Sequence, residues 1–555
     1  MARRTRRGSA LILALSVLMV VFLAGSAVLS LSLQAMRRGR LDALRVRAMA
    51  FAEAGGEKAL DYLRRTAPDG TTTGIWRTAG HTEAVDAGGD YTISVADGTG
   101  DNAGKLVITS TGRATDGTLT ARRSIRVTIK LEREDVSVWN NAIFGGVGQA
   151  GRSINGNVQI RGSVHLLGDG EEFTDLDGDQ RWDAGEPYLD TNRNGAWDPG
   201  EPYTDIDGDG RRDPREPFLD VNGNGTRDPA LTVTDLSSEF SGDAKIGNNY
   251  AGMPSSLRSL IPALPTTSFE GETVETLNAK LRVKHGRVNI SGSATAGDPQ
   301  APGGSPMVKE TLNGTYVNDG WGGNKGASQV YSDNGTSTKY NLGNMVRFPT
   351  LIEPVTKNGV SYASYMDYLR DAGMVLSGSL TIKKGTAYGP ISDGRGNSLS
   401  VDTAGNIDIR GIVYVNGDIK LERNGGDQSM RYTGRGTLVS TGSISISTHL
   451  VPATAFFPQQ NVIGMIARRD LNLATGSGDA QLYLSGAFYA QQKITSVKQN
   501  ELVGTFVSSY FAMQNVPHMY QVPTLPDNLP PGMPGSERIW VKTIRVDGWR
   551  EVASS

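Results

Sequence analysis

The stretch Ser9-Ala-Leu-Ile-Leu-Ala-Leu-Ser-Val-Leu-Met-Val-Val-Phe-Leu-Ala-Gly-Ser-Ala-Val-Leu-Ser-Leu-Ser-Leu33 decides the architecture of this 555-residue chain, because it contains no charged residue. About 20 apolar helical residues cross the hydrocarbon core of a bilayer, whereas the apolar part of a secretory signal is only about 7–15 residues long. Residues 1–8 carry four arginines and end in Gly8. Because basic segments stay cytoplasmic, the sequence predicts a single-pass helix that sends the rest of the chain outward.

The helical pattern continues beyond Leu33 and becomes amphipathic. Its apolar residues alternate with arginines and glutamates and are Leu41, Leu44, Ala48, Phe51, Ala52, Leu60 and Leu63. This spacing places them along one side of a helix. The pattern therefore predicts one long helix over 9–65.

The residues along this helix resemble the N-terminus of PilX-type large minor pilins of type IV pili. The likeness consists of the short basic leader ending in Gly8, the Ser9-Ala-Leu-Ile-Leu-Ala-Leu15 start, and Ala-Met-Ala-Phe-Ala-Glu-Ala-Gly-Gly-Glu-Lys-Ala-Leu at 48–60. The resemblance implies that a prepilin peptidase cuts between Gly8 and Ser9 and methylates the new N-terminus. It also implies an inner-membrane prepilin that moves to the pilus at the cell surface, with other minor and major pilins as partners. A plain membrane anchor is the alternative.

The fifth residue after the expected cut is Leu13, where major pilins carry a glutamate. That glutamate is thought to neutralise the amino terminus of the neighbouring subunit, since an isolated charge in hydrocarbon is costly. Its loss favours a position at the pilus tip, where no subunit precedes this one. The alternative is that minor pilins tolerate the loss anywhere along the fibre.

Residues 66–135 are expected to form a pilin-like antiparallel sheet. Tyr91–Val95, Lys105–Ser110 and Ser124–Leu131 alternate apolar and polar residues, which is typical of strands with one buried face. The tail Arg538–Val552 alternates in the same way, after a Pro-rich passage over 517–534 that reads as an extended linker. We therefore interpret 517–555 as a linker and strands that rejoin the pilin domain.

Residues 136–516 are expected to form a β-solenoid inserted into that domain. The chain has 70 Gly and 24 Pro, which fits short strands joined by many turns. Apolar residues restart after a polar turn at Ile419, Ile444 and Leu471, 25 and 27 residues apart. A period of this length is typical of solenoids, in which each coil buries its strands on its neighbours. The fold class is therefore α+β and mainly β; a β-sandwich is the alternative for this part.

An insert over 173–232 repeats every 15 residues, with units beginning at Phe173, Tyr188, Tyr203 and Phe218. Each unit matches the spacing of an EF-hand loop, in which carboxylates at positions 1, 3, 5, 9 and 12 surround Ca²⁺. The predicted ligands are Asp175, Asp177, Asp179, Asp183 and Glu186 in loop 1; Asp190, Asn192, Asn194, Asp198 and Glu201 in loop 2; Asp205, Asp207, Asp209, Asp213 and Glu216 in loop 3; and Asp220, Asn222, Asn224 and Asp228 in loop 4.

Calcium is expected to be a structural cofactor of these loops. Only three residues, beginning with a proline, separate successive loops, so EF-hand helices do not fit and the loops are expected to stack directly. Gln180 replaces the usual glycine of loop 1, and Leu231 stands where loop 4 needs its final glutamate. Loop 4 is therefore predicted to bind weakly or to cap the array. A merely acidic linker is the alternative.

The body outside the acidic insert is basic. Residues 169–228 hold 18 Asp and Glu against 6 Arg, so the remainder of a chain of net charge −2 carries +10. The candidate DNA-binding residues are Lys280, Arg282, Lys284, Arg287, Lys383, Lys384, Arg468 and Arg469. Together with a layout that resembles competence-associated large pilins, they suggest capture of extracellular double-stranded DNA during natural transformation. Solvated surface charges are the alternative interpretation.

Catalysis is not expected. The chain has no cysteine and five scattered histidines, and we find no serine-hydrolase elbow, P-loop or zinc-protease motif. A polysaccharide-cleaving solenoid with paired carboxylates is the enzymatic alternative. The non-enzymatic alternatives to a DNA receptor are a subunit that primes pilus assembly, an adhesion subunit and a type II secretion pseudopilin.

Overall fold

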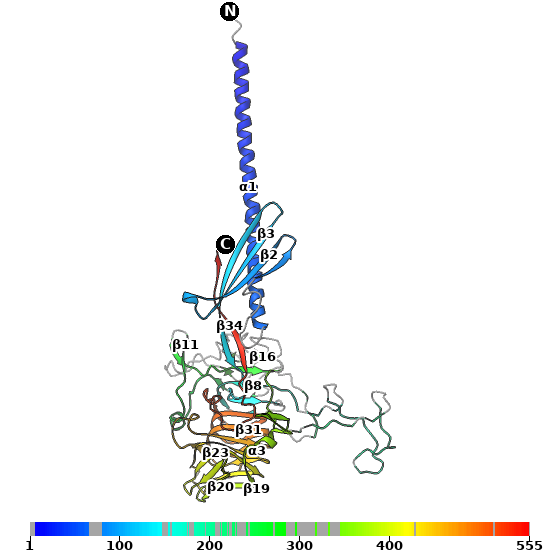
Figure 1. The fold of residues 1–555 in the computed structure, drawn as a ribbon, viewed down its shortest axis with the longest axis vertical. Coiled ribbons are helices and arrows are strands. Elements are labelled where there is room, and N and C mark those ends of the chain that lie inside the picture. The colour runs from blue at the N-terminus through cyan, green and yellow to red at the C-terminus, as the bar shows by residue number, and fades with distance from the viewer. Residues whose placement is uncertain are drawn as a thin grey trace, which may run out of the picture. The chain divides into compact units, whose positions relative to one another are not determined.

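The chain is mainly β with one long apolar helix, as the computed structural model shows (Figure 1). It divides into two compact units, Met1–Asp135 with Trp540–Ser555, and Val136–Ile539. The structure describes residues 6–553 except 66–79, 147–153, 156–157, 172, 175, 177–181, 195, 206–210, 213, 219, 221–224, 228, 230–239, 242–244, 270–271, 285–294, 297–316, 319–330, 333–344, 427–428 and 514–516.

Helix α1 spans Arg6–Arg65 and ends where the sequence predicted. Its first half is exposed, with large side chains such as Leu11, Phe22 and Leu31 each more than 60% accessible. Within the described residues, the helical stretch Ala10–Leu63 contains an 18-residue window apolar enough to cross a membrane, with a mean hydropathy of 2.7. The second half of α1 instead buries its apolar side against the sheet of its own unit.

That sheet is antiparallel, in the order β1-β2-β3-β4-β34. Its strands are β1 (His81–Asp86), β2 (Gly89–Asp97), β3 (Leu106–Thr115), β4 (Thr120–Asp135) and β34 (Trp540–Val552), and a short 3-10 helix, η1 (Gly100–Asn102), lies between β2 and β3. Strands β2, β3 and β4 confirm the three predicted strands. The predicted return of the C-terminal tail is also confirmed, because β34 pairs with β4 along most of its length.

Helix and sheet of this unit approach closely at glycines. A Cβ at Gly112 of β3 would collide with the backbone carbonyl of Ala48 in α1, and a Cβ at Gly55 of α1 would collide with the side chain of Ser110. Around them, Phe51 and Leu60 of α1 pack in one cluster with the inward-facing residues of β2, β3 and β4. The hydrophobic core of this unit therefore lies between the helix and the sheet.

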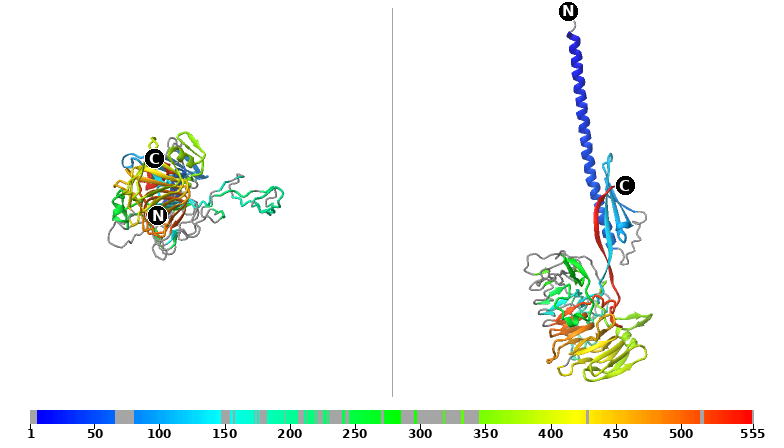
Figure 2. Two further views of the ribbon diagram at one scale, coloured as in Figure 1. Left: turned by 90° about the horizontal axis from the view of Figure 1, so that it is seen from below. Right: turned by 90° about the vertical axis from the view of Figure 1, so that its left-hand side faces the viewer.

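The strands of the second unit stack on one another (Figure 2), and those that the structure describes pair as three parallel ladders. The first runs β19 (Met374–Ser377), β23 (Asn406–Asn416), β26 (Arg435–Ser440), β29 (Val462–Ala467), β31 (Tyr483–Ser496), β32 (Glu501–Met513), β5 (Ile143–Gly145), β8 (Val164–Leu166), β13 (Leu281–Val283) and β16 (Tyr331–Ser332).

The second ladder runs β20 (Leu380–Lys383), β24 (Ile419–Glu422), β27 (Ile444–Ile446), β30 (Leu471–Leu473), β31, β32, β6 (Ile154–Asn155) and β9 (Phe240–Ser241). The third runs β23, β25 (Ser429–Thr433), β28 (His449–Pro452), β31, β32, β33 (His518–Tyr520), β7 (Gln159–Arg161), β10 (Lys245–Gly247) and β14 (Thr295–Ala296). The β-sandwich alternative predicts antiparallel neighbours and does not match these ladders.

The remaining elements lie at the edges of the ladders or outside them. Antiparallel pairs join β21 (Tyr388–Ser392) to β22 (Ser398–Val401), β22 to β23, β14 to β15 (Val317–Asn318), β11 (Thr266–Phe269) to β12 (Glu272–Glu275), and β17 (Val355–Lys357) to β18 (Val360–Tyr362). The described part of the unit also contains two short helices, α2 (Ser255–Arg258) and α3 (Tyr365–Ala372).

The repeat seen in the sequence corresponds to register in the second ladder. Ile419 pairs with Ile444, and Ile444 pairs with Leu471. All three side chains are fully buried. Each restart of the repeat thus stacks on the previous one, and burial of the aligned apolar side chains stabilises neighbouring strands together.

The first strand and the last long strand of this unit are neighbours in the middle of the first ladder. Strand β32, the last long strand, pairs with β5, the first, so that Phe506 lies opposite Ile143. The chain runs from β5 to one end of the ladder at β16, and starts again from the other end at β19. The pairing of β32 with β5 therefore joins the two halves of the unit.

The expected linker over 517–534 is instead part of the second unit. Strand β33 pairs with both β32 and β7, and Val522, Leu525 and Met533 are buried. The indole N–H of buried Trp139 donates to the carbonyl of Pro534 at 2.7 Å. Proline composition suggested an extended segment, but its apolar residues are buried and its backbone is paired.

Candidate functional site

The four 15-residue repeats of the acidic insert, called unit 1 to unit 4 in chain order, form two nested antiparallel pairs. Phe173 bridges to Phe218 and Tyr188 bridges to Tyr203, so unit 1 pairs with unit 4 and unit 2 with unit 3. Backbone hydrogen bonds of 2.8–2.9 Å flank the bridges, from Thr174 to Pro217, Leu189 to Pro202 and Thr204 to Pro187. The loops were expected to stack directly on one another; the bridges pair them about the centre of the insert.

Loop 2 is the loop in which the structure describes all five predicted ligands. The carboxylate of Asp198 accepts the side-chain amides of Asn192 and Asn194 at 2.6 and 2.7 Å. The Asn194 backbone N–H donates to Asp190 at 3.2 Å and to Asn192 at 3.0 Å. The loop thus links its oxygen-bearing side chains through hydrogen bonds around one turn of backbone.

Glu201 closes loop 2. Its Oε1 accepts the Thr191 N–H at 2.7 Å and its Oε2 accepts the Asp198 N–H at 3.0 Å. The hydrogen bond from the Asp198 backbone is the main reason that the pKa of Glu201 lies below its usual value. The carboxylate therefore bridges positions 2 and 9 of the loop, and its residue is only 7% exposed.

Glu216 makes the same contacts, but in loop 1. Its Oε1 accepts the Leu176 N–H at 2.6 Å and its Oε2 accepts the Asp183 N–H at 3.0 Å, which are positions 2 and 9 of that loop. The sequence assigned Glu216 to loop 3 and Glu186 to loop 1. The structure differs because the Phe173–Phe218 bridge brings unit 4, with the glutamate that precedes it, against unit 1.

The residue at position 8 packs on the aromatic ring of the paired unit in every loop. Trp182 meets Phe218 and Trp197 meets Tyr203 edge-on, with ring centroids 5.7 and 6.1 Å apart. In the other two loops an arginine takes this place: Arg212 over Tyr188 and Arg227 over Phe173, both at 4.5 Å. These four contacts follow the same pairing of unit 1 with 4 and 2 with 3.

Position 8 also identifies the glutamate that belongs to each loop. Trp197 Nε1 donates to the Glu201 carbonyl and Trp182 Nε1 to the Glu216 carbonyl, both at 3.0 Å. In loop 4 the equivalent donor is Arg227 Nε, which reaches the carbonyl of Glu171 at 2.9 Å. Glu171 therefore has the place in loop 4 that Glu201 has in loop 2.

Sequence reasoning missed Glu171 because it lies before the first complete repeat. The available signal was a glutamate two positions before each aromatic residue, at 171, 186, 201 and 216. These four residues are all buried, at 1%, 5%, 7% and 2% exposed respectively. Loop 4 was expected to lack a glutamate, since Leu231 replaces it in the linear repeat; the bridge supplies one from the other end of the insert.

The other predicted ligands are described only in part. Asp205 is exposed, and Asp220 accepts the Gly225 N–H at 2.8 Å. In the part of the insert that the structure describes, no three Asp, Glu or His side chains form a metal-binding cluster. Nine predicted ligands lie outside the described residues: Asp175, Asp177, Asp179, Asp207, Asp209, Asp213, Asn222, Asn224 and Asp228.

The first cluster of candidate DNA-binding residues is largely buried. Arg282 and Lys284 are 4% and 5% exposed, and the Lys284 ammonium binds the Asp169 carboxylate at 2.7 Å. Lys280 lies next to them and donates to Asn278 at 3.3 Å, while Arg287 lies outside the described residues. Buried cations do not reach phosphates, so Arg282 and Lys284 do not fit the predicted role.

The two other basic clusters are on the surface but apart from each other. Lys383 ends β20, and Lys384 donates to the Ser429 hydroxyl at 2.7 Å. Arg468 and Arg469 are exposed in the turn between β29 and β30. These two pairs of cations therefore remain the described candidates for contact with phosphates.

Gly8 and Ser9, the predicted processing residues, lie near the start of α1. The described histidines lie in four separate strands, β1, β8, β28 and β33. One of them, His518, contacts the buried Glu501 at 3.0 Å, and the Tyr520 hydroxyl donates to the other oxygen of Glu501 at 3.0 Å. These contacts connect β33 to β32, and burial raises the pKa of Tyr520.

No protein-family model and no curated protein sequence matches this chain. Among solved structures, it is similar to the crystal structure of the competence-associated pilin ComZ from Thermus thermophilus, with 18% sequence identity and a TM-score of 0.45 over 91% of this chain and 98% of that one. This TM-score does not establish a shared fold, so the chain's own residues carry the functional argument.

Proposed function

We propose that this chain is a minor pilin or pseudopilin of a type IV pilus or competence machinery. The supporting observation is helix α1, whose apolar first half is exposed while its second half packs on an antiparallel sheet. An apolar helix of this length is stable in a bilayer, and needs other helices around it once it leaves. Other minor and major pilins are therefore the proposed partners, and the inner membrane and then the cell surface the proposed locations.

Processing at Gly8 tests this proposal. With a prepilin peptidase co-expressed, the wild-type chain is expected to lose residues 1–8, and the Gly8→Val variant to keep them and stay in the membrane. Gly25→Val, a substitution in the same helix where a side chain meets nothing within 4 Å, serves as the matched control. Equal processing of the Gly8 and Gly25 variants would exclude a prepilin.

We propose a position near the pilus tip, because Leu13 stands where major pilins carry a glutamate. Gold-labelled antibody against the second unit is expected to mark fibre ends. Label distributed along the shaft would exclude this position.

The three parallel ladders support a further part of the proposal, that the second unit is a β-solenoid inserted in the sequence between the strands of the first unit. Aligned burial of Ile419, Ile444 and Leu471 is the expected signature of such stacking.

Binding of extracellular double-stranded DNA by this body is the proposed activity. Lys383, Lys384, Arg468 and Arg469 remain the candidate contacts. Because phosphate contacts release counterions, binding is expected to weaken steeply between about 50 and 200 mM salt. The test is a salt series with the detergent-solubilised full chain and duplex DNA, with and without calcium. No binding at low salt in either state would leave pilus priming, adhesion or a type II secretion role as the function. No catalytic role is proposed.

Calcium is proposed as a structural staple of the acidic insert, with glutamates exchanged between loops. By the pairing described above, loop 1 would use Glu216, loop 2 Glu201, loop 3 Glu186 and loop 4 Glu171. Each carboxylate oxygen has two lone-pair directions, so an oxygen that accepts a backbone N–H also has one for a cation. A cation bound in this way would connect unit 1 to unit 4 and hold the base of the insert closed.

A further inference from the structure

A polar pocket of about 440 Å³ lies beside helix α3 and is lined by Tyr362, Asp367, Arg370, Asp371 and Arg395. Its volume is within the range of small-ligand sites. The lining combines two guanidinium groups, two carboxylates and one phenol, contributed by β18, α3 and the turn between β21 and β22. None of these residues belongs to the insert or to the basic clusters proposed for DNA.

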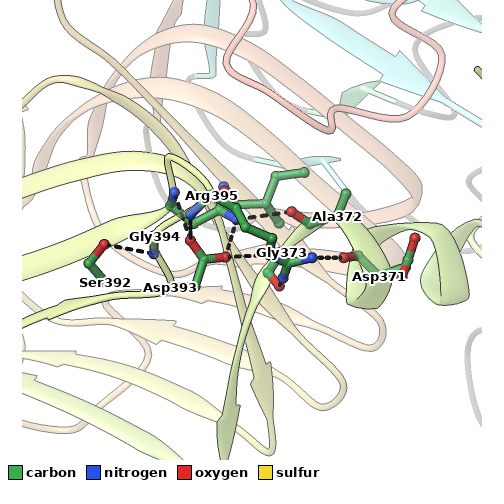
Figure 3. A network of polar contacts seen from close by, with 9 residues as sticks. Asp371, Ala372, Gly373, Ser392, Asp393, Gly394 and Arg395 are labelled. Carbon is green, nitrogen blue, oxygen red and sulfur yellow. Dashed lines mark hydrogen bonds and ion pairs between the residues drawn. The ribbon is translucent and has the colours of Figure 1, made fainter.

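The Arg395 side chain is fixed in place by the end of α3. Figure 3 shows its guanidinium at the carbonyls of Asp371 and Gly373, which accept N–H groups at 2.9 and 2.7 Å, while Nε–H donates to Asp393 at 3.1 Å. A hydrogen bond from the Asn397 side chain is the main reason that the pKa of Asp393 is lowered to about 2. Because a guanidinium has five N–H groups, two remain, and no described residue accepts them.

The acidic side of the pocket is also held in position. The Tyr362 hydroxyl donates to Asp371 Oδ2 at 2.8 Å, and this bond raises the pKa of the phenol, which therefore stays protonated. On helix α3, Arg370 donates to Asp367 at 3.1 Å, and the N-cap residue Ser364 donates to the other oxygen of Asp367 at 2.8 Å. Asp371 is exposed, and so is the Arg370 side chain, at 60%.

This lining is chemically matched to hydroxyl groups. Its two positive and two negative charges cancel, so it has no excess charge to attract phosphate. A carboxylate oxygen accepts from a hydroxyl, and a guanidinium donates two parallel N–H groups to neighbouring oxygens. The Tyr362 ring adds an apolar face for C–H groups; it belongs to an aromatic cluster in which Tyr368 lies 5.6 Å from Tyr362 and 5.3 Å from Tyr365.

From this combination we propose that the pocket binds a neutral carbohydrate, with a hexopyranose ring against Tyr362 and its vicinal hydroxyls between Asp371 and the arginines. The chain would then attach to a surface polysaccharide through the second unit, independently of any DNA binding.

The test uses the detergent-solubilised full chain and three probes: maltohexaose, cellohexaose and chitohexaose. At least one is expected to bind, with the same affinity at low salt and at about 0.5 M salt, since a neutral ligand releases no counterions. Arg370→Ala and Asp371→Asn are each expected to weaken binding about tenfold or more, because each removes charged hydrogen bonds. Arg410→Ala is the matched control, an arginine whose side chain is 70% exposed and 3.8 Å from Asp408 on β23.

Thermal unfolding of each variant separates lost binding from lost folding, and Tyr362→Phe provides a second conservative change. Three results would each overturn the proposal: none of the three sugars binds; the pocket variants bind as the wild type does; or the pocket residues are required only for salt-sensitive binding of duplex DNA.

Discussion

Replacing Glu216 by Gln distinguishes exchanged from linear calcium loops. In the linear assignment Glu216 completes loop 3, whose position 8 is Arg212; in the structure its carboxylate lies in loop 1, beside Trp182. Terbium substitutes for calcium and its luminescence is excited by a nearby indole. In a Trp197→Phe background, Glu216→Gln is therefore expected to abolish terbium luminescence from the insert.

The expected loss of folding stability in Glu216→Gln follows from the contacts of the Glu216 carboxylate. Glu216 accepts two backbone N–H groups at 2.6 and 3.0 Å and is 2% exposed, so its amide variant leaves one buried N–H without an acceptor, at about 1–3 kcal/mol. If the site binds calcium with the 10⁻⁴ to 10⁻³ M affinity of extracellular modules, about 10 mM calcium stabilises the wild type by a further 1.4–2.7 kcal/mol or so, and the variant loses this gain.

The assay is a terbium titration of the full chain, followed by thermal unfolding with and without calcium. Glu186→Gln is the matched control, since exchange places Glu186 in loop 3. Loss of the Trp182-sensitised signal in Glu186→Gln, with the signal retained in Glu216→Gln, would refute the exchange and restore the linear loops. No terbium signal in any variant would exclude loop 1 as a cation site.

Three shorter predictions follow. Gly112→Val is expected to destabilise the first unit by about 1–3 kcal/mol, since the side chain would collide with the Ala48 carbonyl; a thermal melt with an unchanged midpoint would contradict this. Asp393, whose folded pKa of about 2 lies below the usual value, stabilises the fold above pH 4 or so, and this contribution should be lost as pH falls through the folded pKa; acid unfolding of Asp393→Asn should therefore lack this step. Arg468→Ala should reduce the salt slope of DNA binding by about 1, and an unchanged slope would remove this residue from the interface.

Local pattern was sufficient to predict the helix and several strands of the first unit as elements. The uncharged stretch and the stripe through Phe51 predicted α1 to its last residue, because helical burial depends on spacing of three and four residues. Alternation predicted β2, β3, β4 and the returning tail. The restart residues of the repeat predicted which positions stack, as Ile444 and Leu471 do.

The same local patterns do not predict which distant strands of the second unit pair with each other. Nothing in the residues around Ile143 indicates Phe506 as their neighbour, since any apolar strand of matching register would serve. The glutamates of the insert show the same limit: spacing placed Glu216 in loop 3, and only the Phe173–Phe218 bridge assigns it to loop 1. Among candidate DNA contacts, charge alone did not distinguish exposed Arg468 from buried Lys284.

The most direct test of the central proposal, that the chain is a pilus subunit, is intact mass spectrometry of the protein recovered from sheared fibres. A pilin subunit is expected to be present there and to begin at Ser9, with residues 1–8 removed and one methyl group added. A chain that stays in the membrane fraction with its leader attached, or one cut beyond Leu33, would contradict the proposal.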